Sequence, residues 1–408
     1  MQSNKIKIIF LFLFTILIAV SGSIDWENNI GINYNLVIFY LLISLVFIFQ
    51  VLQKKKIIFL PNNKTIKNIF FLFAITSLII TLFRDGIIIT YFLFIVLTFI
   101  LLIVFNQLLY NLKIKDALLI FMVAMFILML INLYFHYLKT GTFNVLSGAR
   151  TWDFRLSGVL GGGLAGALAG ISAILPIILY LIGARKHKVF LTLNISLAWF
   201  ILLLADNRTS MIACTFIYLL FFLYYSRKSI KAKILFFAIG IIIFLFIRFY
   251  LTSTTGGDFI EQDANYRELI WIFGIDQIFQ SPLLGYGKQN PFASSNIAIE
   301  AIGQAKLGDP HNAFLFYILR NGIVVSFLFF WFIILFLVFA YKKARNSKYL
   351  ILFSFPIYWF IIGITGGDYF NFSLNFSSVV FGISVFGMLN HPDIQKLTKI
   401  KSLPVNIK

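Results

Sequence analysis

The chain has 408 residues, of which 60% are hydrophobic and 12% are charged, and it contains 50 phenylalanines. This composition excludes a water-soluble globular protein, because there is too little polar surface to cover one. The net charge of +19 does not indicate nucleic-acid binding, since the cations lie in short clusters between apolar segments rather than on one surface. The sequence therefore predicts an all-α integral membrane protein, a single membrane domain over residues 1–408 whose first partner is the lipid bilayer.

Twelve apolar segments are expected to be membrane-spanning helices, since a helix needs about 20 residues to cross a bilayer. Each segment is continuous rather than alternating, which favours helices over β-strands. The first segment also fits a cleavable signal peptide, and we prefer an uncleaved helix. The expected cores are residues 6–20, 34–52, 66–83, 87–105, 117–134, 164–181, 190–205, 211–224, 234–250, 313–340, 349–364 and 370–389.

The distribution of charge predicts that both termini face the cytoplasm. With the N-terminus inside, the inner side holds 24 lysines and arginines with 2 acidic residues, and the outer side holds 10 with 13. Such an excess of cations on one side is the positive-inside pattern. The sequence thus predicts an N-in/C-in protein with about twelve membrane-spanning helices.

Two of the expected outer loops are long, at residues 135–163 and 251–311. Long loops in a compact fold often carry functional residues. The second loop, between the ninth and tenth spans, contains four large apolar residues at helical spacing beside polar ones. These are Leu269, Ile270, Phe273 and Phe279. The pattern predicts an amphipathic helix lying at the membrane surface.

Arginine and lysine are distributed differently between the two sides. Seven of the ten outer cations are arginine, whereas only three of the 24 inner cations are. Topology rules treat the two residue types alike, so orientation does not explain the difference. Arginine has a planar fork that binds phosphate oxygens in bidentate fashion and stays charged when partly desolvated. The skew predicts an anionic, phosphate-bearing ligand on the outer side.

Some outer arginines are expected to have other roles, pairing with outer acids or stacking on aromatic rings. Arg84, beside Asp85, is expected to be structural in this way. The outer arginines are Arg84, Arg150, Arg155, Arg208, Arg248, Arg267 and Arg320.

The sequence GDPHNAFLFYILRNG, residues 308–322, places a histidine at the start of a span and an arginine inside it. His311 lies at the expected outer water boundary, where Asp309 or Asn312 would cap the helix. An imidazole suits removal of a proton from a hydroxyl, although a lone histidine there is more often a cap or a satisfied polar group. Arg320 lies about 13 Å deeper, on nearly the opposite helix face. A charge at that depth costs roughly 2.5–3.5 kcal/mol and persists mostly beside a partner or a water-filled cavity.

Metal and nucleophile chemistry find no support in the sequence. No set of His, Cys, Asp and Glu has the spacing of a metal site, and there is no P-loop and no Ser-His-Asp order. The tight outer acid pairs, Asp25/Glu27 and Glu261/Asp263, are more readily explained as solvated loops. We therefore expect neither a metal nor a cofactor.

Four outer motifs follow one another over roughly residues 150–322. They are Arg155-Leu156-Ser157-Gly158; Asp206-Asn207-Arg208-Thr209-Ser210 between two spans; Arg267 with Trp271 and the sequence PLLGYG at 282–287; and His311-Asn312 opening a span that carries Gly322. In this order they resemble the superfamily of bacterial O-antigen ligases and O-antigen or capsule polymerases (Wzy). There are two departures: Gly161-Gly162-Gly163 stands where such proteins often have Asn-Pro-Asn, and Asn207 stands where serine is common.

The resemblance implies a GT-C-like glycosyltransferase that acts on undecaprenyl-diphosphate-linked glycans at the outer face of the bacterial inner membrane. Arg208 and Arg267 would bind the diphosphate, with Arg155 and Arg320 as further candidates. His311 would accept the proton of the acceptor hydroxyl, with inversion at the anomeric carbon. The expected partners are the lipid-linked donor and acceptor, with chain-length regulator and flippase proteins as further candidates.

Within this superfamily we prefer a polymerase that transfers the growing chain onto a new lipid-linked repeat unit. The alternative is a ligase that transfers the finished glycan to a lipid A core. A flippase or ion-coupled transporter is disfavoured, because all 15 acidic residues fall in loops or at span ends and no span is clearly broken by paired Gly and Pro. A GT-C enzyme that uses monophosphate-linked sugars, with Asp25 and Glu27 as its first-loop acids, also stays open.

Overall fold

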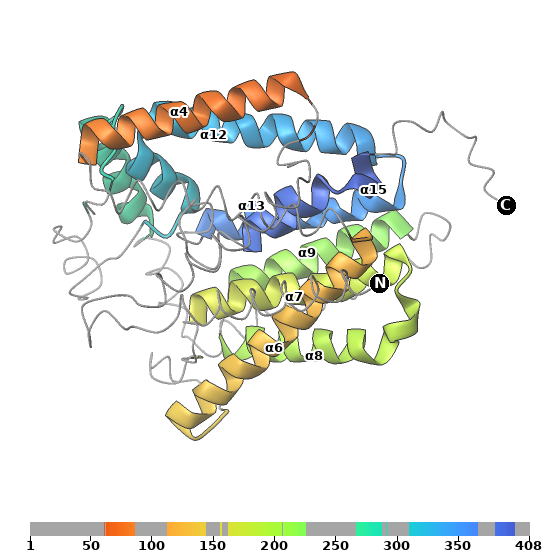
Figure 1. The fold of residues 1–408 in the computed structure, drawn as a ribbon. Coiled ribbons are helices and arrows are strands. Elements are labelled where there is room, and N and C mark those ends of the chain that lie inside the picture. The colour runs from red at the N-terminus through yellow and green to blue at the C-terminus, as the bar shows by residue number, and fades with distance from the viewer. Residues whose placement is uncertain are drawn as a thin grey trace, which may run out of the picture.

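The protein is described by a computed structural model that covers about half of the chain. The described residues are 61, 63–85, 112–143, 156, 162–205, 207–225, 267–287, 291, 310–365 and 380–395. Within them every regular element is helical, as the sequence predicts (Figure 1).

Five of the described helices are long and apolar enough to cross a membrane. They are α4 (Lys64–Asp85), α6 (Ile114–Thr140), α7 (Gly162–Ile182), α8 (Lys188–Leu204) and α12 (Ala313–Ala344). Two further apolar helices are shorter, α9 (Arg208–Tyr225) and α13 (Ser354–Thr365). The spans expected at 6–20, 34–52, 87–105 and 234–250 lie outside the described residues, so the number twelve and the N-in/C-in topology stay predictions.

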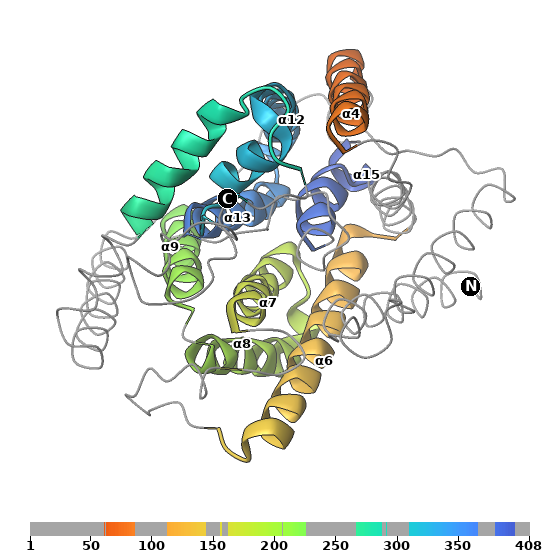
Figure 2. The ribbon, with the colours of Figure 1, turned by 90° about the vertical axis from the view of Figure 1, so that its left-hand side faces the viewer.

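Helix α7 lies at the centre of the described bundle, with α6, α8, α9 and α13 around it (Figure 2). The half of α7 that begins the helix is rich in Gly and Ala, and small residues let helix backbones approach closely inside a membrane. A Cβ on Gly170 would lie 2.0 Å from the hydroxyl oxygen of Tyr358 on α13. Glycine at this position is therefore what allows α13 to pack against α7.

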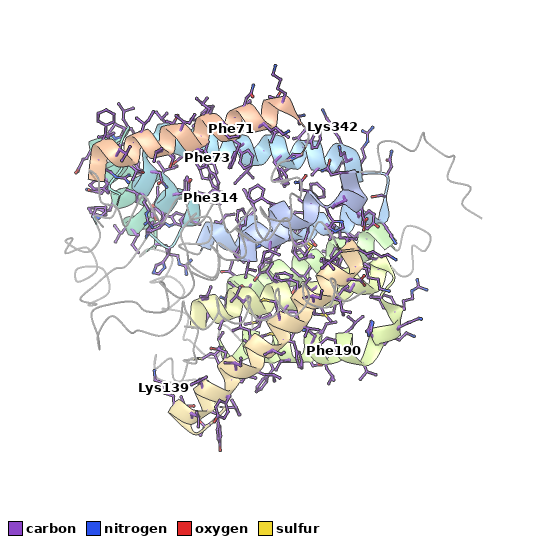
Figure 3. All side chains as sticks on the ribbon, viewed as in Figure 1. Phe71, Phe73, Lys139, Phe190, Phe314 and Lys342 are labelled. Atoms are coloured by element: carbon purple, nitrogen blue, oxygen red, sulfur yellow. The ribbon has the colours of Figure 1, made fainter. Side chains whose placement is uncertain are left out.

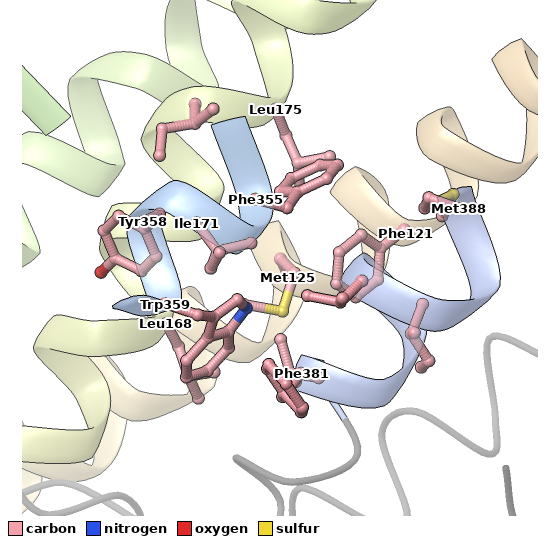
Figure 4. Close-up of a cluster of buried hydrophobic side chains, with 14 of the residues drawn as sticks. Phe121, Met125, Leu168, Ile171, Leu175, Phe355, Tyr358, Trp359, Phe381 and Met388 are labelled. Carbon is pink, nitrogen blue, oxygen red and sulfur yellow. The ribbon is translucent and has the colours of Figure 1, made fainter. Parts of the chain in front are cut away.

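The core is formed by large side chains of α6, α7, α13 and the segment 380–389 (Figure 4). Trp359 and Phe381 meet edge to face, with ring centroids 5.7 Å apart. The indole N–H of Trp359 donates to Ser384 Oγ at 2.9 Å, so the buried polar group of this residue is satisfied. Ser384 belongs to a π-helical turn, η4 (Gly382–Gly387), within the last part of the span expected at 370–389.

Large apolar side chains also cover the outside of the bundle. Phe71 on α4 is 59% exposed, and Figure 3 shows the side chains that project from this helix away from the core. On α12, Phe327 and Trp331 are likewise exposed and stack on each other. An apolar surface of this extent is expected where a protein faces hydrocarbon rather than water.

One end of the bundle, which we call the lysine end, is tied together by polar contacts. Lys115 Nζ donates to the carbonyl of Gly183 at 3.2 Å, and Lys348 Nζ donates to the carbonyl of Ile182 at 3.0 Å. The carboxylate of Asp393, in the short helix α15 (Pro392–Gln395), accepts from the amide of Ile114 at 3.0 Å. The described cations at this end are Lys64, Lys67, Lys113, Lys115, Arg185, Lys186, Lys188, Lys342, Lys343, Arg345 and Lys348.

The opposite end, the arginine end, holds Arg84, Arg208, Arg267 and His311. Helix α4 runs antiparallel to α12, since Phe73 packs on Phe329 and Phe70 packs on Phe332, with ring centroids 5.4 and 5.2 Å apart. Most of the described lysines thus lie at one end, whereas Lys139, in the last turn of α6, lies away from it. The membrane topology itself stays a prediction.

The span expected at 313–340 is not one continuous helix. Gly322 has φ 77° and ψ 166°, and the two parts of α12 meet there at a kink. The sequence analysis looked for paired Gly and Pro, whereas this break occurs at a single glycine. The physical reason lies outside the helix, in the loop that fills the break.

Candidate active site at the arginine end

The break in α12 is filled by the loop of residues 282–287, the PLLGYG loop. In a continuous helix the amide of Ile323 would donate to the carbonyl of Leu319. Instead, the Ile323 amide donates to the carbonyl of Pro282 at 2.7 Å, and the Leu319 carbonyl accepts from the amide of Tyr286 at 2.8 Å. The loop thus supplies partners for backbone groups that the break leaves without their helical ones.

Two glycines make this docking possible. A Cβ on Gly322 would lie 2.1 Å from the carbonyl oxygen of Leu283, and a Cβ on Gly285 would lie 2.5 Å from the amide nitrogen of Gly322. Both glycines also have positive φ, 77° and 64°, which disfavours any residue with a side chain. The two backbones are therefore in direct contact, and that contact requires glycine at 285 and at 322.

The predicted helix in the long loop is present at residues 267–280, the teal helix beside α12 in Figures 1 and 2. Its Ile270 is fully buried and forms a small core with Leu319 of α12. The hydroxyl of Tyr286 donates to Gln277 Oε1 at 2.8 Å, so the PLLGYG loop folds back on the helix that precedes it. Helix and loop form one unit that sits on the first part of α12.

The apolar residues of this helix lie on two faces rather than on the single face that the sequence analysis assumed. Ile270 and Phe273 pack inward, whereas Leu269 and Phe279 are 50% and 74% exposed. Alternation of buried and exposed apolar residues allows the helix to contact α12 on one side and to present an apolar surface on the other. The prediction that this surface lies at the membrane interface is retained as a prediction.

Trp271 connects this helix to the start of α12. Its indole N–H donates to the carbonyl of Pro310 at 3.0 Å, next to His311. Arg267 lies one helical turn before Trp271, on the same side of the helix. The structure therefore brings Arg267 and His311, which are far apart in the sequence, to the same corner of the arginine end.

His311 is exposed and has φ 47°, a left-handed conformation that is uncommon for a residue with a side chain. The next residue, Asn312, caps α12, because its Oδ1 accepts from the amides of Phe314 and Leu315 at 3.0 Å each. Of the two capping residues that the sequence allowed, Asn312 is thus the one that caps.

Arg208 is the first residue of α9 and is half-buried. The preceding Asn207 caps the helix, accepting from the Ser210 amide at 3.0 Å, and its Nδ2 donates to the carbonyl of Gly163 at the start of α7. A Cβ on Gly166 would lie 2.3 Å from the Cβ of Asn207, so this contact also depends on a small residue in α7. Asparagine in place of the serine common in the superfamily therefore serves both as a cap and as a tie to α7.

Helix α13 links the start of α9 to the start of α12. The hydroxyl of Tyr358 lies 3.0 Å from Ser210 Oγ, two residues after Arg208. In the same turn of α13, Phe360 packs edge to face on Phe314 of α12, with centroids 5.4 Å apart. Arg208 and His311 therefore stand at helix starts that meet on one turn of α13.

The remaining two predicted residues are only partly placed. Arg320 is half-buried and immediately precedes the break, where its carbonyl accepts from the amide of Gly287 at 3.0 Å. Arg155 lies outside the described residues. Its neighbour Leu156 is buried, and its amide donates to the carbonyl of Leu204 at 3.2 Å, at the end of α8. The first motif thus adjoins the turn that carries Arg208.

The sequence analysis missed the role of Arg84. One guanidinium nitrogen of this residue, Nη1, donates to the carbonyls of Leu284 and Arg320, at 2.9 and 2.6 Å. The expectation that Arg84 is structural fits these contacts, which are to backbone oxygens distant in sequence. Among the described residues there is no group of three or more His, Cys, Asp and Glu side chains that could hold a metal ion.

Residues 193–330 match the family model Wzy_C, described as O-antigen ligase. The resemblance to the O-antigen ligase and polymerase superfamily is thereby confirmed. The Wzy_C segment contains Arg208, the helix 267–280, the PLLGYG loop, His311 and the break at Gly322, whereas Arg155 lies before it. No match to the chain was found among curated proteins.

Proposed function

We propose that the protein is a membrane glycosyltransferase that polymerises a bacterial surface polysaccharide from repeat units linked to undecaprenyl diphosphate. The observation that carries the proposal is the docking of the PLLGYG loop into the α12 break. This contact brings Arg267 beside the helix start that carries His311, and α13 joins that corner to Arg208. The match to an O-antigen ligase family model supports a reaction on lipid-linked glycans.

In the proposed reaction, a hydroxyl of the lipid-linked acceptor unit attacks the anomeric carbon of the growing chain. The bond from that carbon to the diphosphate oxygen breaks, and undecaprenyl diphosphate leaves with both electrons of the bond. His311 takes the hydroxyl proton, and attack from the side opposite the leaving group inverts the anomeric centre. The product is a chain longer by one repeat unit on the acceptor's carrier lipid.

Arg208 and Arg267 are assigned to the diphosphate, with Arg155 and Arg320 as further contacts. Negative charge on the diphosphate grows as the bond breaks, so donors aimed at its oxygens stabilise the transition state more than the bound donor. Loss of one such donor typically costs about 10²–10³ in rate. Guanidinium groups supply this charge in the proposal without a metal or a cofactor. The site faces the outer side of the inner membrane, where chain-length regulator and flippase proteins would meet it.

The second candidate is an O-antigen ligase, which the description of the matched family favours. It would use the same leaving group but transfer the finished glycan to a lipid A core. Deleting the gene separates the two, because loss of a polymerase leaves a single repeat unit on the surface. Loss of a ligase leaves full-length polymer on its carrier lipid.

The broken helix at Gly322 is also a feature of transporters, many of which bind substrates where a helix is unwound. In such sites the freed backbone groups line a cavity for the substrate. Here the Leu319 and Arg320 carbonyls accept instead from amides of the PLLGYG loop. This arrangement favours a fixed structural junction over a transport site.

The decisive experiment compares polysaccharide ladders on gels from cells carrying His311→Ala, Arg208→Lys or Arg267→Lys. A lysine keeps the charge and removes the fork, so both lysine variants should shorten or abolish the ladder at normal membrane abundance. Arg345→Lys is the matched control, because Arg345 is exposed at the lysine end. Unchanged ladders in both Arg208→Lys and Arg267→Lys would refute the diphosphate assignment.

A further inference from the structure

We propose that Arg84 is a positioning residue of this site, which acts through the backbone at the α12 break rather than on the substrate. The inference rests on the proposed function. Arg84 is near the end of α4, and its Nη1 donates to the carbonyls of Leu284 and Arg320 at 2.9 and 2.6 Å. One nitrogen thus joins α4, the PLLGYG loop and α12. A guanidinium Nη carries two hydrogens, so both hydrogens of this nitrogen are used.

The position of this guanidinium suits the groups it meets. Residues 313–321 form the first part of α12, and the carbonyls of its last turn point toward the break. A cation at the C-terminal end of a helical segment is favoured by the helix dipole, and hydrogen bonds from an ionised donor are the stronger kind. Backbone carbonyls inside a membrane protein need such partners, because lipid provides none. Arg84 therefore serves as a helix cap supplied by another helix.

The contact helps to position two of the arginines proposed to bind the diphosphate, Arg267 and Arg320. Leu284 lies in the loop that follows the helix beginning at Arg267, and the other acceptor is the main chain of Arg320 itself. Helix α4 is held in place independently, by the aromatic contacts of Phe73 with Phe329 and of Phe70 with Phe332. Loss of the Arg84 side chain should therefore leave α4 packed on α12 and let the loop shift relative to α12. A shift of about 1 Å in a positioning element can cost about 100-fold in rate.

The test compares Arg84→Met with Arg84→Lys in membranes supplied with lipid-linked repeat units. Methionine keeps an unbranched stem without donors, whereas lysine keeps hydrogens for both carbonyls. We expect kcat for elongation to fall by about 100-fold in Arg84→Met and to stay near the parent value in Arg84→Lys. Arg345→Met, at the exposed lysine end, is the control for loss of an arginine.

A covalent cross-link between the PLLGYG loop and α12 distinguishes a positioning role of Arg84 from direct binding of the substrate by Arg84. Leu283 and Ile323 are 62% and 44% exposed, and adjoin each other because Pro282 accepts from the Ile323 amide. In a Leu283→Cys, Ile323→Cys background, a short thiol cross-linker should hold the loop on α12 while the native Cys214 stays buried. Cross-linking should raise the elongation rate of Arg84→Met toward that of the parent.

Where the parent protein elongates the polymer, either of two results would overturn the proposal: normal elongation by Arg84→Met, or a cross-link that forms fully and restores nothing. The second would mean that Arg84 itself touches the substrate. If the protein without the two cysteine substitutions forms no polymer, the proposed function fails instead, and the rate of cross-linking then tests only the contact of Arg84 with the loop and α12. Arg84→Met must slow cross-linking relative to the cysteine parent, because a shifted loop holds its thiol less often beside α12; equal rates would refute this contact.

Discussion

Replacement of Gly322 by alanine tests whether the PLLGYG loop is docked in the break. The added Cβ would lie 2.1 Å from the carbonyl oxygen of Leu283, and the backbone at φ 77° and ψ 166° is open almost only to glycine. The backbone strain costs about 1–3 kcal/mol. Undocking the loop would break three backbone hydrogen bonds between the loop and α12, at Pro282, Tyr286 and Gly287, each worth about 1 kcal/mol. Keeping the loop docked against a strained residue and detaching the loop therefore cost similar amounts of free energy. We expect the loop to detach from α12 while the rest of the bundle stays folded.

The assay measures labelling of a buried position under the helix. Ile270 is fully buried, so the thiol in an Ile270→Cys background should react slowly with a maleimide until Gly322→Ala releases the helix. Gly141→Ala is the matched control, because Gly141 also has a positive φ, 68°, but a Cβ there meets nothing within 4 Å. Equal labelling with Gly322→Ala and Gly141→Ala would show that strain alone matters and would refute the docking.

Three further changes test other parts of the fold. Tyr358→Phe removes the hydroxyl that bonds to the Ala167 carbonyl and to Ser210, and should lower stability in detergent by about 1–3 kcal/mol, measured as the midpoint of thermal unfolding. Asp393→Ala removes the acceptor for the Ile114 amide and should cost about 1 kcal/mol, whereas Asp393→Asn, which keeps an oxygen, should cost less. Phe279→Asp places a charge on the exposed apolar face of the helix 267–280. If this face lies in the membrane, the charge should expose it, and a water-soluble label should react with it more in the variant than in the parent. Equal labelling of variant and parent would contradict the interfacial prediction.

The helices were predictable because length and continuous apolarity are local properties of the sequence. The break in α12 was not, because an isolated glycine in an apolar run is usually tolerated within a helix. The break is stabilised by hydrogen-bond donors and acceptors of residues 282–287, which lie in the long loop that precedes α12. Sequence periodicity contains no information about such a partner.

The candidate site was predictable as a set of motifs but not as an arrangement. The PLLGYG motif and Gly322 were both noted, yet nothing in the sequence indicates that their backbones touch. The capping choice between Asp309 and Asn312 was open for the same reason, since both residue types cap helices and only the structure gives the bonds. Arg84 was assigned by its neighbour in sequence, whereas the carbonyls of Leu284 and Arg320 that it binds are 200 and 236 residues away.

The contacts of Arg84 also change what the excess of outer arginines implies. That excess predicted a phosphate-bearing ligand, because the guanidinium fork is suited to phosphate oxygens. A guanidinium can also donate to two backbone carbonyls that belong to different elements, and Arg84 does so through the two hydrogens of its Nη1. One outer arginine is thus explained without a ligand, and the argument for a diphosphate rests more narrowly on Arg208 and Arg267. These two stand at the starts of helices, where the helix dipole favours an anion such as a diphosphate.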